Sequence, residues 1–155
     1  MLMYNELFKM LEERSRDDLK GYWMAISELQ RTILGPYIER NGLAGMYEYW
    51  AHIIEEENCE ADMELTDDYF EFRMNVCPSL SKNLDNDAGL CTQYCDHCAG
   101  WIQPVVERYG YHVVYDMISR SEPRCRMRIY RDREKANEFA SETRLAAQPY
   151  AGGTS

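Results

Sequence analysis

The sequence predicts an α+β fold. N-terminal helices are followed by two β-hairpins, which form an antiparallel sheet of about four strands around a cysteine-rich helix, and a helix closes the chain. Apolar residues recur at helical spacing through residues 1–57, whereas residues 59–76 and 111–131 alternate between apolar and polar side chains. Both pairs of strands are connected locally, which favours antiparallel pairing.

Three helices are expected in residues 1–57, which form the helical part of one predicted domain. The first carries an apolar stripe, and Ser15-Arg-Asp-Asp18 has the form of a capping box that starts the second. Gly35-Pro36 is expected to end the second helix, and Asn41-Gly42 precedes the third. His52 lies off the apolar stripe of the third helix and is interpreted as a surface histidine. The stripes are Tyr4, Leu7, Phe8 and Leu11, then Leu19, Tyr22, Trp23, Ile26, Leu29 and Ile33, then Leu43, Met46, Tyr47, Trp50, Ile53 and Ile54.

The first hairpin is expected over residues 59–66 and 69–76, with Thr66-Asp-Asp68 as its turn. Cys77-Pro78 should end it, because proline cannot continue a paired central strand. Residues 79–89 are rich in Ser, Asn and Asp and are expected to form a polar loop.

The cysteine-rich helix is expected from about Leu90 to Tyr109, with a kink or break at Pro104 and Gly110 at its C-terminal end. A second hairpin should follow, with strands over residues 111–118 and 125–130. The last helix is expected over about 132–146, and residues 147–155 as a flexible tail. Residues 58–146 would thus hold the sheet and the cysteine-rich helix of a single domain, 1–155.

Composition narrows the classes of function. The net charge of −10 offers no basic patch for nucleic acid or for an anionic membrane. Neither a signal peptide nor a run of about 18 apolar residues is visible, so we expect a cytoplasmic protein. In that compartment the six cysteines are expected as free thiols, metal ligands or catalytic groups rather than disulfides. A homodimer is compatible with the sequence.

The stretch from Cys91 to Cys98 holds three cysteines beside an aspartate and a histidine. On a helix, Cys91, Cys95 and Cys98 would lie at i, i+4 and i+7 on one face, with Asp96 and His97 projecting to either side. Zinc is one interpretation of this stripe, with a fourth ligand from Cys77, Asp96, His97 or Cys125. An isolated iron–sulfur cluster is another.

Thiol chemistry without a metal is the third interpretation. The helix dipole favours a thiolate near a helix N-terminus, and His97 would act as a base or a cation. Burial of the cysteines as small apolar residues is the structural alternative. Cys77 and Cys125 stand at strand ends, where they could face the cysteine-rich helix, whereas Cys59 and His112 are expected to be structural.

The chain resembles the L-2-amino-thiazoline-4-carboxylic acid hydrolase family over roughly residues 69–131. The resemblance lies in Cys77-Pro78 after a strand, in Cys95-Asp96 at a helix start, and in Cys125 at the head of the last strand. It implies hydrolytic opening of a cyclic, amidine-like ring that contains nitrogen and sulfur. The chain departs from the family pattern by its additional Cys91 and Cys98, and by Glu122-Pro-Arg124 in place of the glycine that usually precedes the late cysteine.

Two functions follow as expectations. In the first, the protein is a small-molecule hydrolase with Cys95 as nucleophile or metal ligand, Asp96 and His97 moving protons, and Cys77 and Cys125 lining the pocket. In the second, it is a non-catalytic module in which Cys91, Cys95 and Cys98 bind zinc or sense a ligand.

Overall fold

The computed structural model describes residues 2–57, 59–86 and 89–150 and confirms the α+β class. The elements run in the order α1 (Leu2–Arg14), α2 (Arg16–Asn41), α3 (Leu43–Glu57), β1 (Glu60–Leu65), β2 (Tyr69–Val76), α4 (Pro78–Asp85), α5 (Asp96–Arg108), β3 (His112–Asp116), β4 (Cys125–Tyr130) and α6 (Arg133–Glu142). Among the described residues, no helix combines the length and the apolar character needed to cross a membrane.

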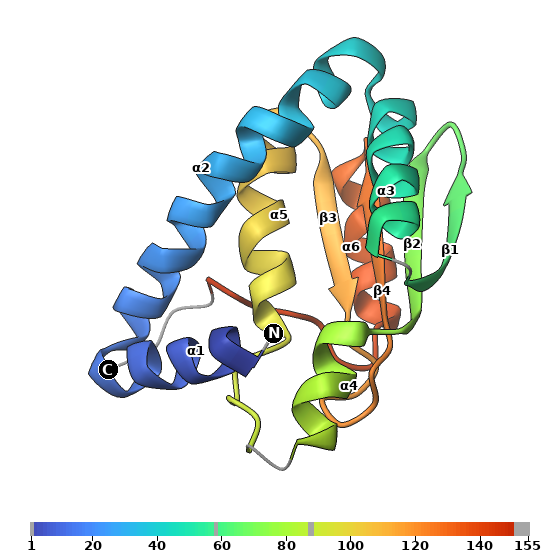
Figure 1. Ribbon diagram of the computed structural model, residues 1–155. Helices are drawn as coiled ribbons and strands as arrows, with labels where there is room; N and C mark the ends of the chain where they lie inside the picture. Colours follow the sequence, from blue (N-terminus) through green and yellow to red (C-terminus); the bar gives the residue numbers. More distant parts are fainter. Residues whose placement is uncertain (1, 58, 87–88, 151–155) are drawn as a thin grey trace.

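The two predicted hairpins form one antiparallel sheet in the order β1-β2-β4-β3. β2 and β4 pair directly at its centre, with Phe70 opposite Ile129 and Phe72 opposite Met127. α2, α3 and α5 lie on one side of the sheet and α6 lies on the other, where it covers β3 and β4 (Figure 1). This arrangement leaves β1 and β3 as the two edge strands.

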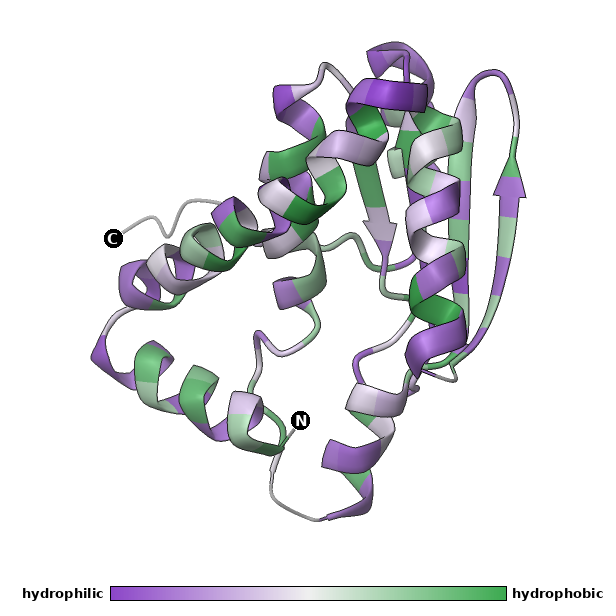
Figure 2. Ribbon diagram, turned by 45° about the horizontal axis from the view of Figure 1, so that its top comes forward, coloured by the Kyte–Doolittle hydropathy of each residue, from purple (hydrophilic) through white to green (hydrophobic). Residues whose placement is uncertain are grey.

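Alternation along the strands separates a core face from a polar face. Phe70, Phe72, Met127 and Ile129 are buried in the core between the sheet and α2, α3 and α5. The intervening positions of β2 and β4 carry charged side chains. Figure 2 shows the resulting mixture of hydrophilic and hydrophobic colour along β2. On this polar face the carboxylate of Glu71, only 2% exposed, forms ion pairs with guanidinium groups on both strands.

The expectation that α2 ends at Gly35-Pro36 was wrong. The helix includes Pro36 and continues to Asn41, where Gly42 adopts a φ of 58° and donates its N–H to the Ile38 carbonyl at 2.7 Å. Packing explains the continuation, because Leu34 and Ile38 on either side of Pro36 are buried in the main core. Tertiary burial here outweighs the hydrogen bond that proline removes.

Residues 78–85 form helix α4 instead of the predicted polar loop. Cys77 is its N-cap, with its sulfur accepting from the Leu80 N–H, and Pro78 occupies the first helical position. Proline is favoured there because the N–H that it lacks would have no helical partner. Leu80 and Asn83 form the buried side of this short helix.

The cysteine-rich helix begins at Asp96 and not near Leu90 as predicted. Residues 92–95 form turns, and the Cys91 N–H is bonded to the Asn5 side chain at 2.9 Å. This bond ties Cys91 to α1 and takes it out of the helical stripe shared by Cys95 and Cys98. The other end agrees with the prediction, since α5 ends at Arg108 and Gly110 adopts a positive φ of 79°.

The C-terminal segment, residues 143–150, follows α6 and packs against the sheet. Its backbone pairs with the end of β3, Pro149 is buried, and the Tyr150 hydroxyl donates to the Gly100 carbonyl at 2.5 Å. Residues 147–150 therefore differ from the predicted flexible tail, whereas residues 151–155 lie outside the described residues.

The α2–α3 contact yields a test of the fold. A Cβ on Gly45 would lie 1.9 Å from the Tyr37 carbonyl oxygen, whereas a Cβ on Gly21 would have no neighbour within 4 Å. We expect Gly45→Ala to lower the free energy of unfolding by about 1–3 kcal/mol or more, because backbone must move. Gly21→Ala should raise it by about 0.5–1 kcal/mol through helix propensity. Urea denaturation measures both, and equal effects would contradict the close approach.

Candidate functional site

Four cysteines line one cavity of about 40 Å³, the thiol cavity, at the end of the sheet where β4 begins. Cys77 comes from the start of α4, Cys95 and Cys98 from the start of α5, and Cys125 from the first position of β4. The remaining lining residues are Leu80, Tyr94, His97, Tyr115, Met117 and Arg124. The cavity holds a group of only a few atoms, since about 10–15 Å³ accommodates one water molecule on this measure.

The strand ends bring Cys77 and Cys125 to this cavity. Cys125 pairs with Met74 in the register of β2 and β4, and shares the core-facing side of β4 with Met127. The Cys77 N–H donates to the Pro123 carbonyl at 2.5 Å and so fixes the segment that leads into β4. Two cysteines 48 positions apart in the sequence are thus placed beside the start of α5.

His97 is oriented so that one ring nitrogen accepts a hydrogen bond from the Cys98 thiol. Its Nδ1 contacts the Tyr94 carbonyl oxygen, which can only accept a hydrogen bond, so Nδ1 carries the hydrogen. Nε2 is then an acceptor and lies 3.4 Å from the sulfur of Cys98. The rings of Phe8, Tyr94 and Trp101 surround the imidazole at centroid distances of 5.4, 5.0 and 4.5 Å. The result is a thiol–imidazole pair in apolar surroundings.

Burial keeps this pair uncharged. Desolvation raises the pKa of Cys98 to about 12 and lowers the pKa of His97 to about 4. The pKa of Cys95 is likewise raised to about 12, first by desolvation and then by the neighbouring Cys98 and Cys77. Burial also raises the pKa values of Cys77 and Cys125. The thiolate expected from the helix dipole is therefore not the resting form, because desolvation outweighs the dipole.

Asp96 adjoins the cysteines in sequence but does not line their cavity. Its carboxylate, 2% exposed, accepts from the Arg120 guanidinium at 3.0 Å and from the Gln148 backbone N–H at 3.3 Å. Arg120 also donates to the Thr92 carbonyl at 2.7 Å. Asp96 thereby joins the turn before α5 to two later segments of the chain.

Cys91 and Cys59 also lie away from the thiol cavity. Cys91 is buried in an aromatic cluster with Phe8 and Trp23, and its sulfur donates to a Glu12 carboxylate oxygen at 3.4 Å. Cys59 is half-buried between α3 and β1. The structure thus brings together Cys77, Cys95, Cys98 and Cys125, and separates Cys91 from the stripe on which the sequence placed it.

No group of three or more His, Cys, Asp or Glu side chains is arranged to hold a metal ion in the described parts of the chain. The thiols that share the cavity are those a soft metal would use, but they are not gathered into a coordination shell.

Five of the lining residues were not predicted from the sequence: Leu80, Tyr94, Tyr115, Met117 and Arg124. Tyr94 lies four residues before Cys98 in the helix that the sequence predicted, and Tyr115 alternates with the core-facing residues of its strand, so residue spacing could have indicated both. Met117 and Arg124 follow β3 and precede β4, where only the sheet register places them.

His112 and His52 are outside the thiol cavity, and His52 is an exposed residue 3.2 Å from Glu56.

The chain matches no protein-family model, no curated protein and no solved structure. The resemblance drawn from its cysteine motifs therefore stands on those residues alone.

The buried imidazole predicts a pH dependence of stability. His97 binds a proton below a pKa of about 4 when folded and below about 6.5 when unfolded, so the fold loses up to about 3 kcal/mol as the pH falls through this window. His97→Gln removes this titration. The difference in unfolding free energy between the wild type and His97→Gln should therefore shrink by about that amount between pH 7 and pH 4. Urea denaturation at several pH values measures it, with exposed His52→Gln as the matched control. A constant difference would contradict the neutral, buried imidazole.

Proposed function

We propose that the protein is a small-molecule hydrolase in which Cys98 is the nucleophile and His97 its general base. The observation that carries this is the 3.4 Å contact between the Cys98 sulfur and the unprotonated Nε2 of His97, at the wall of a cavity. A nucleophile within reach of a base that a third group orients is the arrangement used in covalent catalysis, and the Tyr94 carbonyl is that third group. In this proposal Cys98 and His97 take the roles of nucleophile and base that the sequence analysis assigned to Cys95 and Asp96.

The thiol should attack while it loses its proton. A pKa of about 12 on Cys98 and about 4 on His97 leaves the proton on sulfur, so a thiolate–imidazolium pair is not formed in advance. An uncharged electrophile suits this site, since a charged reacting group would have to be desolvated among thiols and aromatic rings. The amidine-like carbon of a thiazoline ring, which the family resemblance implies, has that character in its neutral form.

Ring opening proceeds through a covalent intermediate on Cys98. The Cys98 proton passes to His97 Nε2 while the sulfur bonds to the ring carbon, and the C=N electron pair moves to the ring nitrogen. That pair then re-forms C=N as the carbon–ring sulfur bond breaks, and the ring sulfur leaves with the proton from His97. Water attacks the same carbon with His97 again as base, and Cys98 leaves with the proton. The sum consumes one water molecule and yields a thiol and a urea group.

The body of such a substrate needs space beyond the 40 Å³ cavity. Cys95 lines this cavity and also a depression of about 370 Å³, whose other lining residues include Thr92, Gln93 and Arg120. We infer that the reacting carbon enters between the thiols while the remainder of the molecule lies in the depression. Cys95, Cys77 and Cys125 then serve as lining groups.

A soft metal ion is the second candidate ligand of this cavity. Four thiols from three parts of the chain favour it, because thiolate is a preferred zinc ligand. Each thiol would have to lose a proton, so affinity should rise steeply with pH. The side chains would also have to move closer together, which makes this the weaker of the two functions.

Cys98→Ala should reduce the opening of 2-amino-thiazoline-4-carboxylate by at least about 100-fold, because the nucleophile is lost. Cys59→Ala, at a thiol outside the cavity, should keep the wild-type rate. Liberated thiol, followed with the protein's own cysteines accounted for, measures the reaction, and mass spectrometry detects the covalent intermediate on Cys98. If Cys98→Ala retains the rate, or the adduct forms on Cys95, the assignment is wrong.

Metal analysis of protein purified without chelator separates the two candidates. For the hydrolase we expect less than about 0.1 equivalent of zinc, and added zinc should inhibit ring opening by occupying the thiols. A full equivalent that is lost in Cys98→Ala and retained in Cys59→Ala would favour the metal site. Absence of both zinc and ring opening would remove both functions.

A further inference from the structure

One edge of the sheet is only partly paired. The C-terminal segment runs antiparallel to β3, where the Ala147 N–H donates to the Tyr115 carbonyl at 3.0 Å and the Met117 N–H donates to the Leu145 carbonyl at 2.8 Å. Backbone groups of alternate residues in a strand point to the same side. The N–H and C=O of Val113 therefore point to this edge as well, whereas those of His112 and Val114 point toward β4.

The C-terminal segment leaves the edge before it reaches Val113. In continued pairing Pro149 would lie opposite Val113, and proline has no N–H to donate. Among the described residues no backbone hydrogen bond joins Val113 to Pro149, and the Tyr150 hydroxyl is bonded to the Gly100 carbonyl on α5. Within the described residues the edge groups of Val113 thus face open space next to a segment that already extends the sheet.

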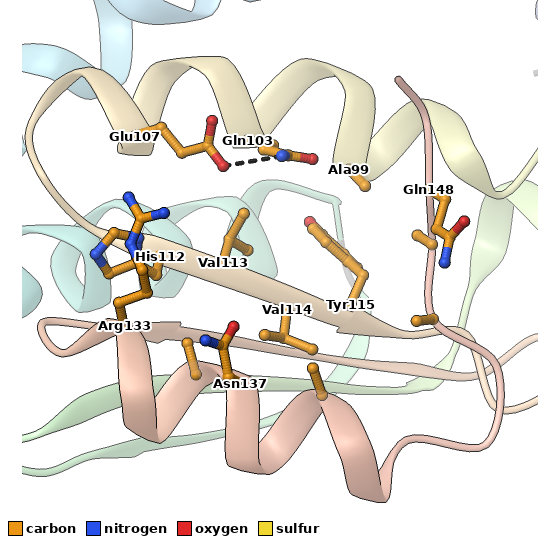
Figure 3. A pocket seen from close by; sticks show the side chains of 14 residues that line it. Ala99, Gln103, Glu107, His112, Val113, Val114, Tyr115, Arg133, Asn137 and Gln148 are labelled. Atoms are coloured by element: carbon orange, nitrogen blue, oxygen red, sulfur yellow. Dashed lines mark hydrogen bonds between the residues drawn. The ribbon is translucent and has the colours of Figure 1, made fainter. Parts of the chain in front are cut away.

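A groove of about 300 Å³ follows this open edge (Figure 3). One wall is a single stripe of α5, with Ala99, Gln103 and Glu107 at intervals of four residues. The other wall is a stripe of α6, formed by Arg133, Ala136, Asn137 and Ala140. Val113 and Val114 lie along the floor between the two helices, and Ala147 and Gln148 line the end where the C-terminal segment turns away.

Two carboxamides flank the open edge, one from each wall. Asn137 makes no side-chain hydrogen bond within the described part of the chain, and Gln103 donates to Glu107 at 2.8 Å, which leaves its carbonyl oxygen to accept. A carboxamide offers a donor and an acceptor, which complement the C=O and N–H of a peptide. The short alanine side chains on both walls let a peptide backbone approach the edge, and the groove volume of about 300 Å³ limits the peptide to small side chains. The charged groups Glu107 and Arg133 lie with His112 at the far end of the groove.

We propose that this groove binds an extended peptide segment with small, uncharged side chains, which adds to β3 as an antiparallel strand in line with the C-terminal segment. Its main chain pairs with the N–H and C=O of Val113, while Gln103 and Asn137 bond to its remaining amide groups. Recognition through main-chain hydrogen bonds at a free sheet edge is an established mode of peptide binding. The site is separate from the thiol cavity, and the proposal does not depend on the hydrolase function.

The test uses the uncharged probe acetyl-Ala-Ser-Ala-Ser-Ala-amide and the full ¹⁵N-labelled chain. We expect its titration to shift the amide resonances of Val113 and Tyr115 and the side-chain amides of Gln103 and Asn137, with saturation. Val113→Pro removes the edge N–H without touching the bonds to β4, and should weaken binding about tenfold. Val113→Ala loses the same side chain but keeps the N–H, so it should bind within about twofold of the wild type.

A second pair of measurements keeps the test independent of the proline variant. Asn137→Leu should weaken binding of the same probe several-fold, and a probe N-methylated at alternate residues should fail to bind because it cannot donate to the edge. No shift at Val113 up to millimolar probe, or equal binding of the N-methylated probe, would overturn the proposal. Concentration-dependent shifts at this edge without any probe would also overturn it, in favour of contact between two copies of the chain.

Discussion

The carboxylate of Asp96 holds together segments that are far apart in the sequence. It stands in the first turn of α5, where the helix dipole favours a negative charge, and it accepts from Arg120 after β3 and from Gln148 in the C-terminal segment. Arg120 extends the connection to the Thr92 carbonyl in the turn before the helix. A buried carboxylate that lost these donors would carry the full cost of desolvation. This constraint fixes where α5 begins, and with it the positions of Cys95 and Cys98.

The sheet could be predicted because its signal is local. Each hairpin is short, its strands alternate in polarity, and Thr66-Asp-Asp68 supplies turn chemistry between the first two strands. The position of Cys125 on the core-facing side of β4 follows from the same alternation. Pairing of β2 with β4 required only that two neighbouring hairpins share one sheet. The fold class and the meeting of Cys77 with Cys125 therefore lay within reach of sequence reasoning.

The errors arose where distant contacts override local preference. Pro36 does not end α2, because Leu34 and Ile38 are buried against the main core. Cys91 has the spacing of a helical stripe, yet Asn5 and Glu12 on α1 hold its N–H and its sulfur outside any helix. The spacing of residues within 90–98 cannot predict a contact with residues 5–12. The proposal of Cys98 and His97 in place of Cys95 and Asp96 rests on the contact of the His97 ring with the Tyr94 carbonyl, which the sequence pattern does not report.

Helix α5 borders two spaces, the buried thiol cavity and the solvent-exposed groove, and different residues of its sequence face each of them. Cys95 and Cys98 at its start line a cavity whose thiols and imidazole are uncharged, because burial raises the pKa of the thiols and lowers the pKa of the imidazole. Its later stripe, Ala99, Gln103 and Glu107, faces an open groove where amide and charged groups remain in contact with solvent. Tyr115 lines both spaces from β3, and burial raises the pKa of its hydroxyl well above the ordinary value. A neutral phenol thus stands between the thiols and the groove, because Tyr115 lines both.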